Sequence, residues 1–340
     1  MSAASIIPPT STDMPDFARA AVNLASAGLG ARALFATDDF FAEVGRMLAD
    51  APAEFYPDKY DDNGKWMDGW ESRRKRTAGH DYAVVRLAAS GVVRGFDIDT
   101  AHFTGNFPPA CRVEACTARG DPGEGTAWTE ILPMTPLGPS AHHYLACASQ
   151  SVWSHIRLHI YPDGGVARLR VYGEPHIDQV AQRGKLLDLA SGLNGGRVIA
   201  YSDAHYGAFQ RLLSPGRGVN MGDGWETRRR RVPGNDWIIV ALGARGVLES
   251  VEIDTAFYKG NYPDSFSLLA ADLPGSGNAL QAAVVTASMF WDEWLPRQKL
   301  EADSIHGFAV KPLGPVTHVR LNIFPDGGIS RLRLFGKLAG

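Results

Sequence analysis

The chain carries the same ordered series of sequence blocks twice, and this duplication limits its fold more than any other feature. The block "DGWESRRKR" begins at Asp68 and returns as "DGWETRRRR" at Asp223. The block "GFDIDTAHFTGNFP" returns as "SVEIDTAFYKGNYP", and "HIRLHIYPDGGVARLRVYG" returns as "HVRLNIFPDGGISRLRLFG". The copies differ in length only between these blocks, as expected when one folded unit has been duplicated. We therefore predict two domains of the same fold.

The repeated blocks also predict the domain boundaries. An N-terminal extension covers residues 1–19, the first repeat covers 20–173, a polar linker with the capacity to form a helix covers 174–184, and the second repeat covers 185–340. A chain of 340 residues is too long for one ordinary core and suits two domains of roughly 150 residues each.

Each repeat has the pattern of a β-sandwich. "DYAVVRL" and "GVVRGFDIDT" are short apolar or alternating runs, which predict two strands with a turn at Gly91. Pro162 and the glycines that follow Asp163 predict a tight turn between two later strands. Many short strands with frequent turns predict an all-β fold of two tandem jelly-roll β-sandwich domains with a few short helices. One of these helices is expected in "TDDFFAEVGRML".

The last hairpin of the first repeat is expected to have one apolar and one polar face. On its first strand, apolar side chains alternate with His155, Arg157 and His159. On its second strand, Arg168 and Arg170 share one face. We interpret this arginine row as a solvated or interface face.

Composition and charge exclude several classes of protein. The net charge is −3 at pH 7, which argues against binding of nucleic acid or of an anionic membrane surface. No apolar run approaches the roughly 18 residues of a membrane-spanning helix. Three cysteines without CxxC spacing, and no signal-peptide pattern, favour a cytoplasmic location. Because the RRKR run follows Asp68 and Glu71 and recurs in register, it is not interpreted as a localisation or nucleic-acid tag.

Common metal, nucleophile and nucleotide motifs are missing from the sequence. It contains no HExxH, paired-cysteine, GxSxG, Walker or dinucleotide Gly-rich pattern. His142 and His143 are assigned to a loop of the first copy only and form a weak metal pair. A divalent ion such as Mn²⁺ is compatible with Asp and His ligands, but the sequence requires no cofactor.

The two copies differ at positions suited to proton transfer. Three histidines of the first copy align with residues that cannot exchange protons near neutral pH: His80 with Asn235, His102 with Phe257 and His159 with Asn322. We therefore expect the first copy to carry any acid-base chemistry. Drift between the copies is the competing explanation.

The repeated blocks, together with the "PLGP" sequences at Pro136 and Pro312, closely resemble the allantoicase (allantoate amidinohydrolase) family. The resemblance covers nearly the whole chain, in order and in both copies. It implies two repeated jelly-roll domains and hydrolysis of allantoate to ureidoglycolate and urea in purine (allantoin) catabolism. Family members typically have a histidine at the position of Phe257, so this departure favours the first-copy His102 as the reactive residue.

The implied reaction needs proton transfer at a carbon that bears a carboxylate and two ureido groups. Urea leaves readily only if it is protonated as it departs, and the attacking water needs a base. We predict His80 and His102 as the proton-transfer pair, with Asp99 or Glu71 orienting one of them.

Charged and amide side chains of the same blocks are expected to bind the ureide substrate. Arg73 or Arg157 suits its carboxylate, because a guanidinium forms two parallel hydrogen bonds with it. Glu71, Asp97 and Asn106 are suited to the ureido N–H groups.

Two alternatives to this interpretation stay open, and one further expectation accompanies it. The DGWE loop can instead plug one end of the sandwich, with Trp70 in the core and Glu71 paired with an arginine. The whole chain can be a non-catalytic tandem module that binds a sugar or another small polar ligand. We also expect a homo-oligomer, because the arginine rows and a segment specific to the second copy are candidate partner surfaces or a lid. This segment is "MFWDEWLPRQKLEADSIHGF", with Phe290, Trp291 and Trp294.

Overall fold

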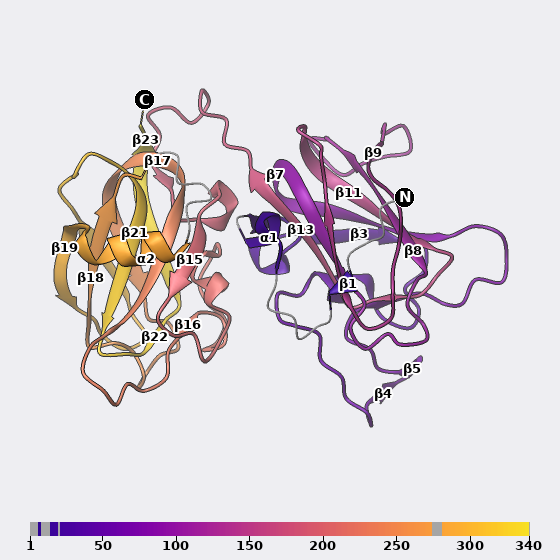
Figure 1. The fold of residues 1–340 in the computed structure, drawn as a ribbon, viewed down its shortest axis with the longest axis horizontal. Coiled ribbons are helices and arrows are strands. Elements are labelled where there is room, and N and C mark those ends of the chain that lie inside the picture. The colour runs from indigo at the N-terminus through magenta and orange to yellow at the C-terminus, as the bar shows by residue number, and fades with distance from the viewer. Residues whose placement is uncertain (1–5, 8–13, 20, 274–280, 340) are drawn as a thin grey trace. The chain divides into compact units, whose positions relative to one another are not determined.

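The computed structural model describes residues 6–7, 14–19, 21–273 and 281–339. The chain divides into two compact units, Met1–His176 and Ile177–Gly340 (Figure 1). Each unit holds one copy of the repeated blocks and consists mainly of antiparallel strands. The predicted all-β fold of two tandem jelly-roll domains with a few short helices is confirmed.

One long strand, β7 (Asp81–Asp99), connects the two sheets of the first unit. Its first half belongs to a sheet that also contains β3 (Arg32–Ala36), β11 (Val152–Tyr161), β8 (Ala110–Cys116) and β9 (Thr129–Pro136). Its second half belongs to a sheet that also contains β13 (Arg168–Pro175), β2 (Val22–Asn23), β10 (His142–Ala146) and β1 (Ile6–Ile7). We call these the first and second sheets.

The turn predicted at Gly91 is wrong, because the strand continues through this residue. Gly91 and Val92 pair with both β11 and β13, so β7 passes here from the first sheet to the second. A Cβ on Gly91 would lie 2.4 Å from the carbonyl oxygen of Glu174. The glycine therefore permits a close approach of two backbones rather than a chain reversal.

The inner faces of the two sheets share one hydrophobic core. Leu158 and Ile160 of β11 pack in it together with Phe96 and Ile98 of β7. Because successive side chains of a strand point to opposite faces, the polar residues between them point outward. His159 thus lies on the outer face of the first sheet, and Asp97 lies on the outer face of the second. These two surfaces are on opposite sides of the first unit.

The arginine row on β13 is not the solvated or interface face that the sequence predicted. Arg168 is only 1% exposed. Its guanidinium donates to the Asp68 carboxylate at 2.6 Å and to the carbonyl oxygen of Ala51 at 2.8 Å. In the second unit, Arg331 donates in the same way to the Asp223 carboxylate at 2.8 Å. Both arginines therefore anchor the loop that carries the DGWE sequence.

The second unit repeats this plan around β17 (Asp236–Asp254). Its first sheet also contains β15 (Arg197–Tyr201), β21 (Pro315–Phe324), β18 (Ser265–Ala271) and β19 (Asp292–Lys299). Its second sheet also contains β23 (Arg331–Leu338), β14 (Leu187–Asp188) and β20 (Ile305–Ala309).

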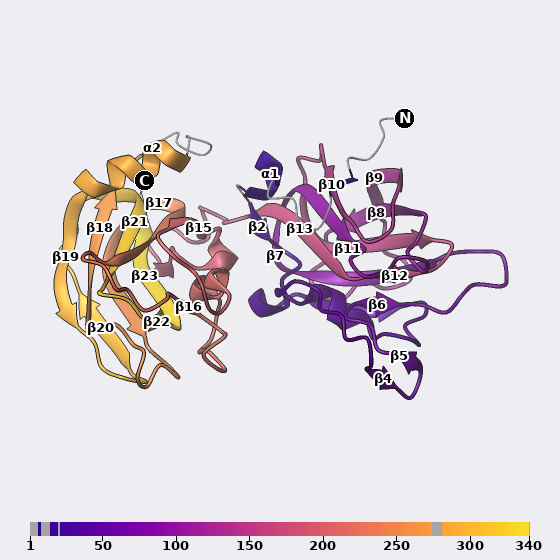
Figure 2. The same cartoon turned by 60° about the horizontal axis from the view of Figure 1, so that its bottom comes forward.

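One face of the second unit has a cover. α2 (Gln281–Ala287) and η5 (Ser288–Phe290) lie across the outer face of its first sheet (Figure 2), where Val284 packs against Ile239 and Ala200. The segment that follows was predicted to be specific to this copy, but β19 and β20 match β9 and β10 in their pairing. Trp294 is buried within it, whereas Phe290 is exposed.

The remaining elements are short. The helical pieces are α1 (Asp16–Arg19), η1 (Ala27–Leu29), η2 (Val44–Leu48), η3 (Gly192–Asn194) and η4 (Phe209–Leu213). The short strands are β4 (Tyr60–Asp61), β5 (Gly64–Lys65), β6 (Trp70–Glu71), β12 (Gly165–Val166), β16 (Trp225–Glu226) and β22 (Gly328–Ile329). The helix predicted in "TDDFFAEVGRML" is present as the 3₁₀ helix η2. Between β13 and β14 the chain forms turns rather than a helix. Within the described ranges, none of the helices has the length and apolar character to span a membrane.

Candidate functional site

The DGWE string holds loops together in both units. Trp70 is fully buried, as predicted, and its indole N–H donates to the carbonyl oxygen of Asp38 at 2.8 Å. Arg73 donates through Nε to the Asp38 carboxylate at 2.7 Å. The Asn106 amide donates to Glu71 at 2.7 Å, so Glu71 is paired with an asparagine rather than with an arginine. Burial raises the pKa of Glu71.

The second unit repeats each of these contacts. Trp225 donates to the carbonyl oxygen of Asp203, Arg228 pairs with the Asp203 carboxylate, and Asn261 donates to Glu226. Glu71, Arg73 and Asn106 therefore have the same kinds of local partner as their counterparts in the second repeat. Their arrangement does not distinguish the first copy from the second.

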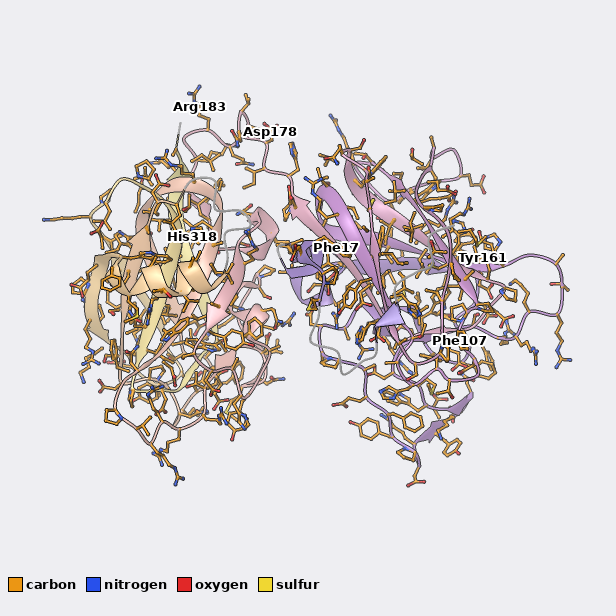
Figure 3. The ribbon with its side chains drawn as sticks, in the orientation of Figure 1. Phe17, Phe107, Tyr161, Asp178, Arg183 and His318 are labelled. Atoms are coloured by element: carbon orange, nitrogen blue, oxygen red, sulfur yellow. The ribbon has the colours of Figure 1, made fainter. Side chains whose placement is uncertain are left out.

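Two of the histidines that distinguish the first copy lie in a hydrogen-bonded series on the outer face of the first sheet. Nε2 of His80 lies 2.8 Å from Nδ1 of His159. Nε2 of His159 lies 2.8 Å from Oε2 of Glu114. We call Glu114, His159 and His80 the relay. The half-buried His80 stands at its outer end and stacks on Tyr161 with ring centroids 4.2 Å apart (Figure 3 labels Tyr161).

Strand pairing and cations fix the inner end of the relay. β8 and β11 pair antiparallel with Glu114 opposite Arg157, which brings the carboxylate within reach of His159 one pleat further on. Arg157 donates to Glu114 through Nε at 2.7 Å, and Arg112 lies 3.2 Å from its other oxygen. Arg157 also lies over Trp128, 4.6 Å from the ring centroid. Arg157 was predicted to bind substrate and is held here by a carboxylate of the protein.

Burial and charge set the protonation of the relay. Burial lowers the pKa of His159 to about 4, even though the hydrogen bond to Glu114 opposes the shift. Burial, and then the charge of Arg112, lower the pKa of His80. Burial would raise the pKa of Glu114, but hydrogen bonds from His159 and Arg157 together lower it. At neutral pH both imidazoles are therefore neutral, and Glu114 is ionised.

The second unit has none of these titrating groups at the matching positions. The pairing of its strands places neutral residues there: Asn235 for His80, Asn322 for His159, Leu269 for Glu114 and Ser267 for Arg112. Of the charged residues in this set, the second unit keeps only the counterpart of Arg157. Arg320, the counterpart of Arg157, is 9% exposed and donates to Ser288 at 2.8 Å beneath the cover formed by α2 and η5.

Asp97 and Asp99 belong to a different set of contacts, on the outer face of the second sheet. Nδ1 of His142 lies 2.8 Å from Asp97 and 3.9 Å from Asp99. The hydrogen bond to Asp97 raises the pKa of His142, and burial raises the pKa of Asp99. His142 does not lie in a loop of the first copy alone, because β10 has a counterpart in β20, where Ile305 takes its place.

His102 lies apart from both sets. Its ring stacks on Phe55 with centroids 5.5 Å apart, and its Nε2 lies 3.1 Å from the carbonyl oxygen of Ala53. Its backbone is left-handed, with φ of 69°, and Phe257 has the same conformation with φ of 70°. The unusual backbone is therefore a property of both repeats and not a sign of chemistry in the first.

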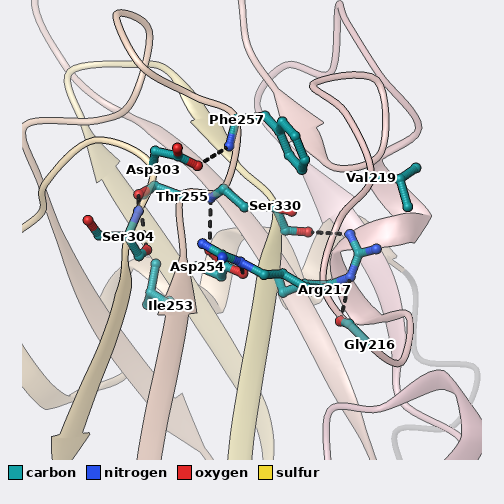
Figure 4. A network of polar contacts seen from close by, with 12 residues as sticks. Gly216, Arg217, Val219, Ile253, Asp254, Thr255, Phe257, Asp303, Ser304 and Ser330 are labelled. Carbon is teal, nitrogen blue, oxygen red and sulfur yellow. Dashed lines mark hydrogen bonds and ion pairs between the residues drawn. The ribbon is translucent and has the colours of Figure 1, made fainter.

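In the second unit, the counterparts of His102 and Asp99 are Phe257 and Asp254, and they have other partners. Figure 4 shows the N–H of Phe257 donating to Asp303 at 2.8 Å. In the same network, Asp254, the counterpart of Asp99, accepts a hydrogen bond from Arg217 at 3.0 Å. A cation from a neighbouring loop thus pairs with Asp254, whereas in the first copy His142 lies 3.9 Å from Asp99 and hydrogen-bonds to Asp97.

The predicted site residues are therefore divided among separate contacts. His80 and Arg157 meet through His159 and Glu114, but the described residues contain no hydrogen bond between His80 and His102. The sequence did not single out Glu114, and it indicated His142 only as half of a weak metal pair. Aligning "ACRVEAC" with "SFSLLAA" would have flagged Glu114, since this charged residue aligns with a leucine there. Over the described ranges, no three His, Cys, Asp or Glu side chains are arranged to hold a metal ion.

Fold and site together define a two-repeat jelly-roll protein whose described residues include a relay of titrating side chains in the first repeat, with neutral residues at the matching positions of the second. The family model "Allantoicase repeat" matches residues 22–176 and 187–339. A probable allantoicase of Rhizobium meliloti is 60% identical over 96% of each chain, and a probable allantoicase 1 of Burkholderia mallei is 56% identical over 98% of this chain and 99% of its own. The crystal structure of allantoicase from Saccharomyces cerevisiae matches 93% of each chain with a TM-score of 0.79 and 31% identity. The chain belongs to the allantoicase family.

Proposed function

We propose that this protein hydrolyses allantoate to ureidoglycolate and urea, with acid-base chemistry in the first repeat. Membership of the allantoicase family over both repeats supports the reaction. The relay is the observation that supports the assignment to the first repeat. Each of its titrating members is replaced by a neutral residue at the matching position of the second repeat.

The reaction requires one base and one acid. Water forms a C–O bond with the central carbon of allantoate and gives up a proton, while the C–N bond to one ureido group breaks and its nitrogen takes up a proton to leave as urea. His80 is suited to accept the proton from water, because it is neutral at pH 7 and half-buried. A positioned base contributes about 10²–10⁴-fold to the rate.

The cations beside the relay are suited to the anionic substrate. Arg157 and Arg112 flank Glu114 on the same face, and Arg112 also lies 3.5 Å from the exposed carboxylate of Glu130. We infer that these two guanidinium groups bind the allantoate carboxylate through charge-assisted hydrogen bonds. The proposal that Arg157 contacts substrate is kept, with Arg112 added to it.

The other predicted residues are assigned lesser roles. Glu71, Arg73 and Asn106 have duplicated partners, and Asp97 and Asp99 lie on the opposite face from the relay. We infer that they shape the repeat rather than react with substrate.

Replacement of His102 tests this narrowing of the site. We expect the His102→Phe enzyme to release urea from allantoate at a rate within a few-fold of the parent. Phenylalanine already occupies this position in the second repeat with the same left-handed backbone, and it can keep the stacking on Phe55. A loss of about 10²-fold or more, measured as kcat, would return His102 to the catalytic role that the sequence predicted.

A direct assay tests the function itself. The purified chain is expected to release urea steadily from allantoate, and the same assay after treatment with a chelator measures any need for a divalent ion such as Mn²⁺. Saturable ligand binding without turnover would favour the alternative, a tandem jelly-roll module that binds a sugar or other small polar ligand, which the family relationship does not favour.

We further infer a cytoplasmic homo-oligomer. The three cysteines are free and buried, which suits a reducing compartment. Phe290 and Met289 are 82% and 66% exposed, which suits a contact with another copy. Light scattering coupled to size-exclusion chromatography measures the number of chains, and a monomer would contradict this inference.

A further inference from the structure

The chemistry of the relay dictates where its protons lie. Ionised Glu114 can only accept a hydrogen bond, so Nε2 of His159 must carry a proton and donate it. A neutral imidazole has one N–H and one lone pair, so Nδ1 of His159 must then accept from His80. Nε2 of His80 is therefore the protonated nitrogen of that ring, and its Nδ1 carries the free lone pair.

We propose that Glu114 and His159 are positioning residues that hold His80 in the Nε2-protonated tautomer and so make its Nδ1 the proton acceptor. The catalytic meaning of this tautomer rests on the proposed function, whereas the tautomer itself exists without substrate. In free histidine side chains either nitrogen can carry the proton, so a fixed tautomer supplies the lone pair in one direction.

The surroundings of the relay favour a fixed rather than an exchanging arrangement. His159 is 4% exposed, which keeps water from replacing its partners. Arg157 and Arg112 hold the Glu114 carboxylate from both sides, and Tyr161 stacks on His80. Both ring nitrogens of His159 are thus hydrogen-bonded within the protein, and Nε2 of His80 is hydrogen-bonded to His159.

The second repeat shows that the fold does not need imidazoles here. Asn235 lies 3.5 Å from Asn322, and Arg320 donates to Asn322 at 2.9 Å. Hydrogen bonding between the same two positions is therefore kept by amides, which do not exchange protons near neutral pH. The histidines and Glu114 add proton transfer to a structure that folds without it.

Glu114→Gln tests the proposal, because a glutamine amide can donate to Nε2 of His159. That change reverses the relay: His159 becomes protonated on Nδ1, donates to Nε2 of His80, and leaves the proton of His80 on Nδ1. Two-bond ¹H–¹⁵N spectra of the full chain labelled at histidine report both tautomers without substrate. We expect Nε2–H for His80 in the parent and Nδ1–H in the variant.

Glu130→Gln is the matched control. Glu130 lies 3.5 Å from Arg112, as an exposed carboxylate on the neighbouring strand, and has no hydrogen bond to His159 among the described contacts. We expect its His80 to keep the parental tautomer and its kcat to stay within a few-fold. If the glutamine variant does not fold, Glu114→Leu copies the second repeat, removes the acceptor, and is expected to give a mixture of both His80 tautomers.

The kcat of the Glu114→Gln variant tests whether the His80 tautomer matters for the reaction. We expect kcat for Glu114→Gln to fall by about 10²-fold or more, since the lone pair of His80 then points toward His159. An Nδ1–H tautomer in the parent, or an unchanged tautomer in Glu114→Gln, overturns the proposal. A reversed tautomer with unchanged kcat also overturns it, because His80 is then not the acceptor. If the parent has the expected tautomer but releases no urea, the proposed function is wrong and the tautomer assignment is still supported.

Discussion

Replacing His80 by asparagine should lower kcat for allantoate by about 10²–10⁴-fold, the range that a positioned base contributes. Asparagine stands at this place in the second repeat, as Asn235, so the substitution is compatible with the fold. It removes the lone pair that accepts the proton of water while leaving an amide to hydrogen-bond with His159. KM should change less than kcat, because the imidazole is expected to act in the transition state rather than in binding.

The pH dependence of the parent gives a second measure of the same group. Burial lowers the pKa of His80 below its ordinary value of 6.5. The unprotonated base is therefore fully present at neutral pH, and kcat/KM is expected to fall in acid, below pH 6.5, as the imidazole takes up a proton. The acid limb should be missing from the small residual activity of His80→Asn.

His176→Asn controls for the general effect of losing a histidine. His176 is exposed within the predicted linker and has no part in the relay. Its variant should match the parent in kcat and in circular dichroism. If His80→Asn folds and turns over allantoate as fast as this control, proton transfer is not carried by the relay.

The sequence predicted the architecture well because duplication and turn chemistry are local signals. The blocks that recur in order gave the two repeats, and the alternation along β11 placed Leu158 inside and His159 outside, as observed. The interpretation of Gly91 as a turn was wrong because a glycine that reverses the chain and one that admits a neighbouring backbone look alike in sequence. Here the neighbour is Glu174, 83 positions away by number (174 − 91), and only the fold brings it close.

The candidate site was predicted only in part, because it depends on strand register. The asymmetry between the copies drew attention to His80 and His159. Their carboxylate partner, Glu114, comes from β8, a strand whose pairing with β11 no local pattern specifies. The predicted proton-transfer pair of His80 and His102 stays a prediction, and the described contacts of the two histidines are with different partners. Adjacency in the duplicated blocks says nothing about which face of the sandwich each side chain occupies.

The arginine row illustrates how a charged residue can be a structural element. A cationic strand face usually indicates a solvated surface, because unpaired charges are rarely buried. Arg168 is the exception, since a carboxylate and several carbonyl oxygens surround its guanidinium. These partners come from loops about 100 residues away in sequence. Repeated sequence alone does not distinguish such an anchor from a surface row.

Arg168→Ala should therefore destabilise the first unit strongly. Truncation removes the guanidinium from the carbonyl oxygens of Ala51 and Asp68 and from the Asp68 carboxylate, which keeps the backbone N–H of Glu54 as a donor but loses its cation. Breaking a buried pair in this way costs about 3–5 kcal/mol. For a domain of this size each kcal/mol corresponds to about 2–4 °C, so the Tm of the first unit should fall by about 10 °C. Guanidinium chloride unfolding measures the free energy, and amide hydrogen exchange should show lost protection near Ala51 and Asp68.

Arg73→Ala is the matched control for this prediction. Arg73 also pairs with an aspartate, Asp38, at 2.7 Å, but its side chain is 61% exposed. Exposed pairs contribute about 1 kcal/mol or less because water screens the charges. The two variants thus compare the same residue type and the same kind of partner at different burial. Equal and small losses of stability would mean that water satisfies the Asp68 loop once the guanidinium is gone, and that the DGWE string is held by Trp70 rather than by its buried arginine.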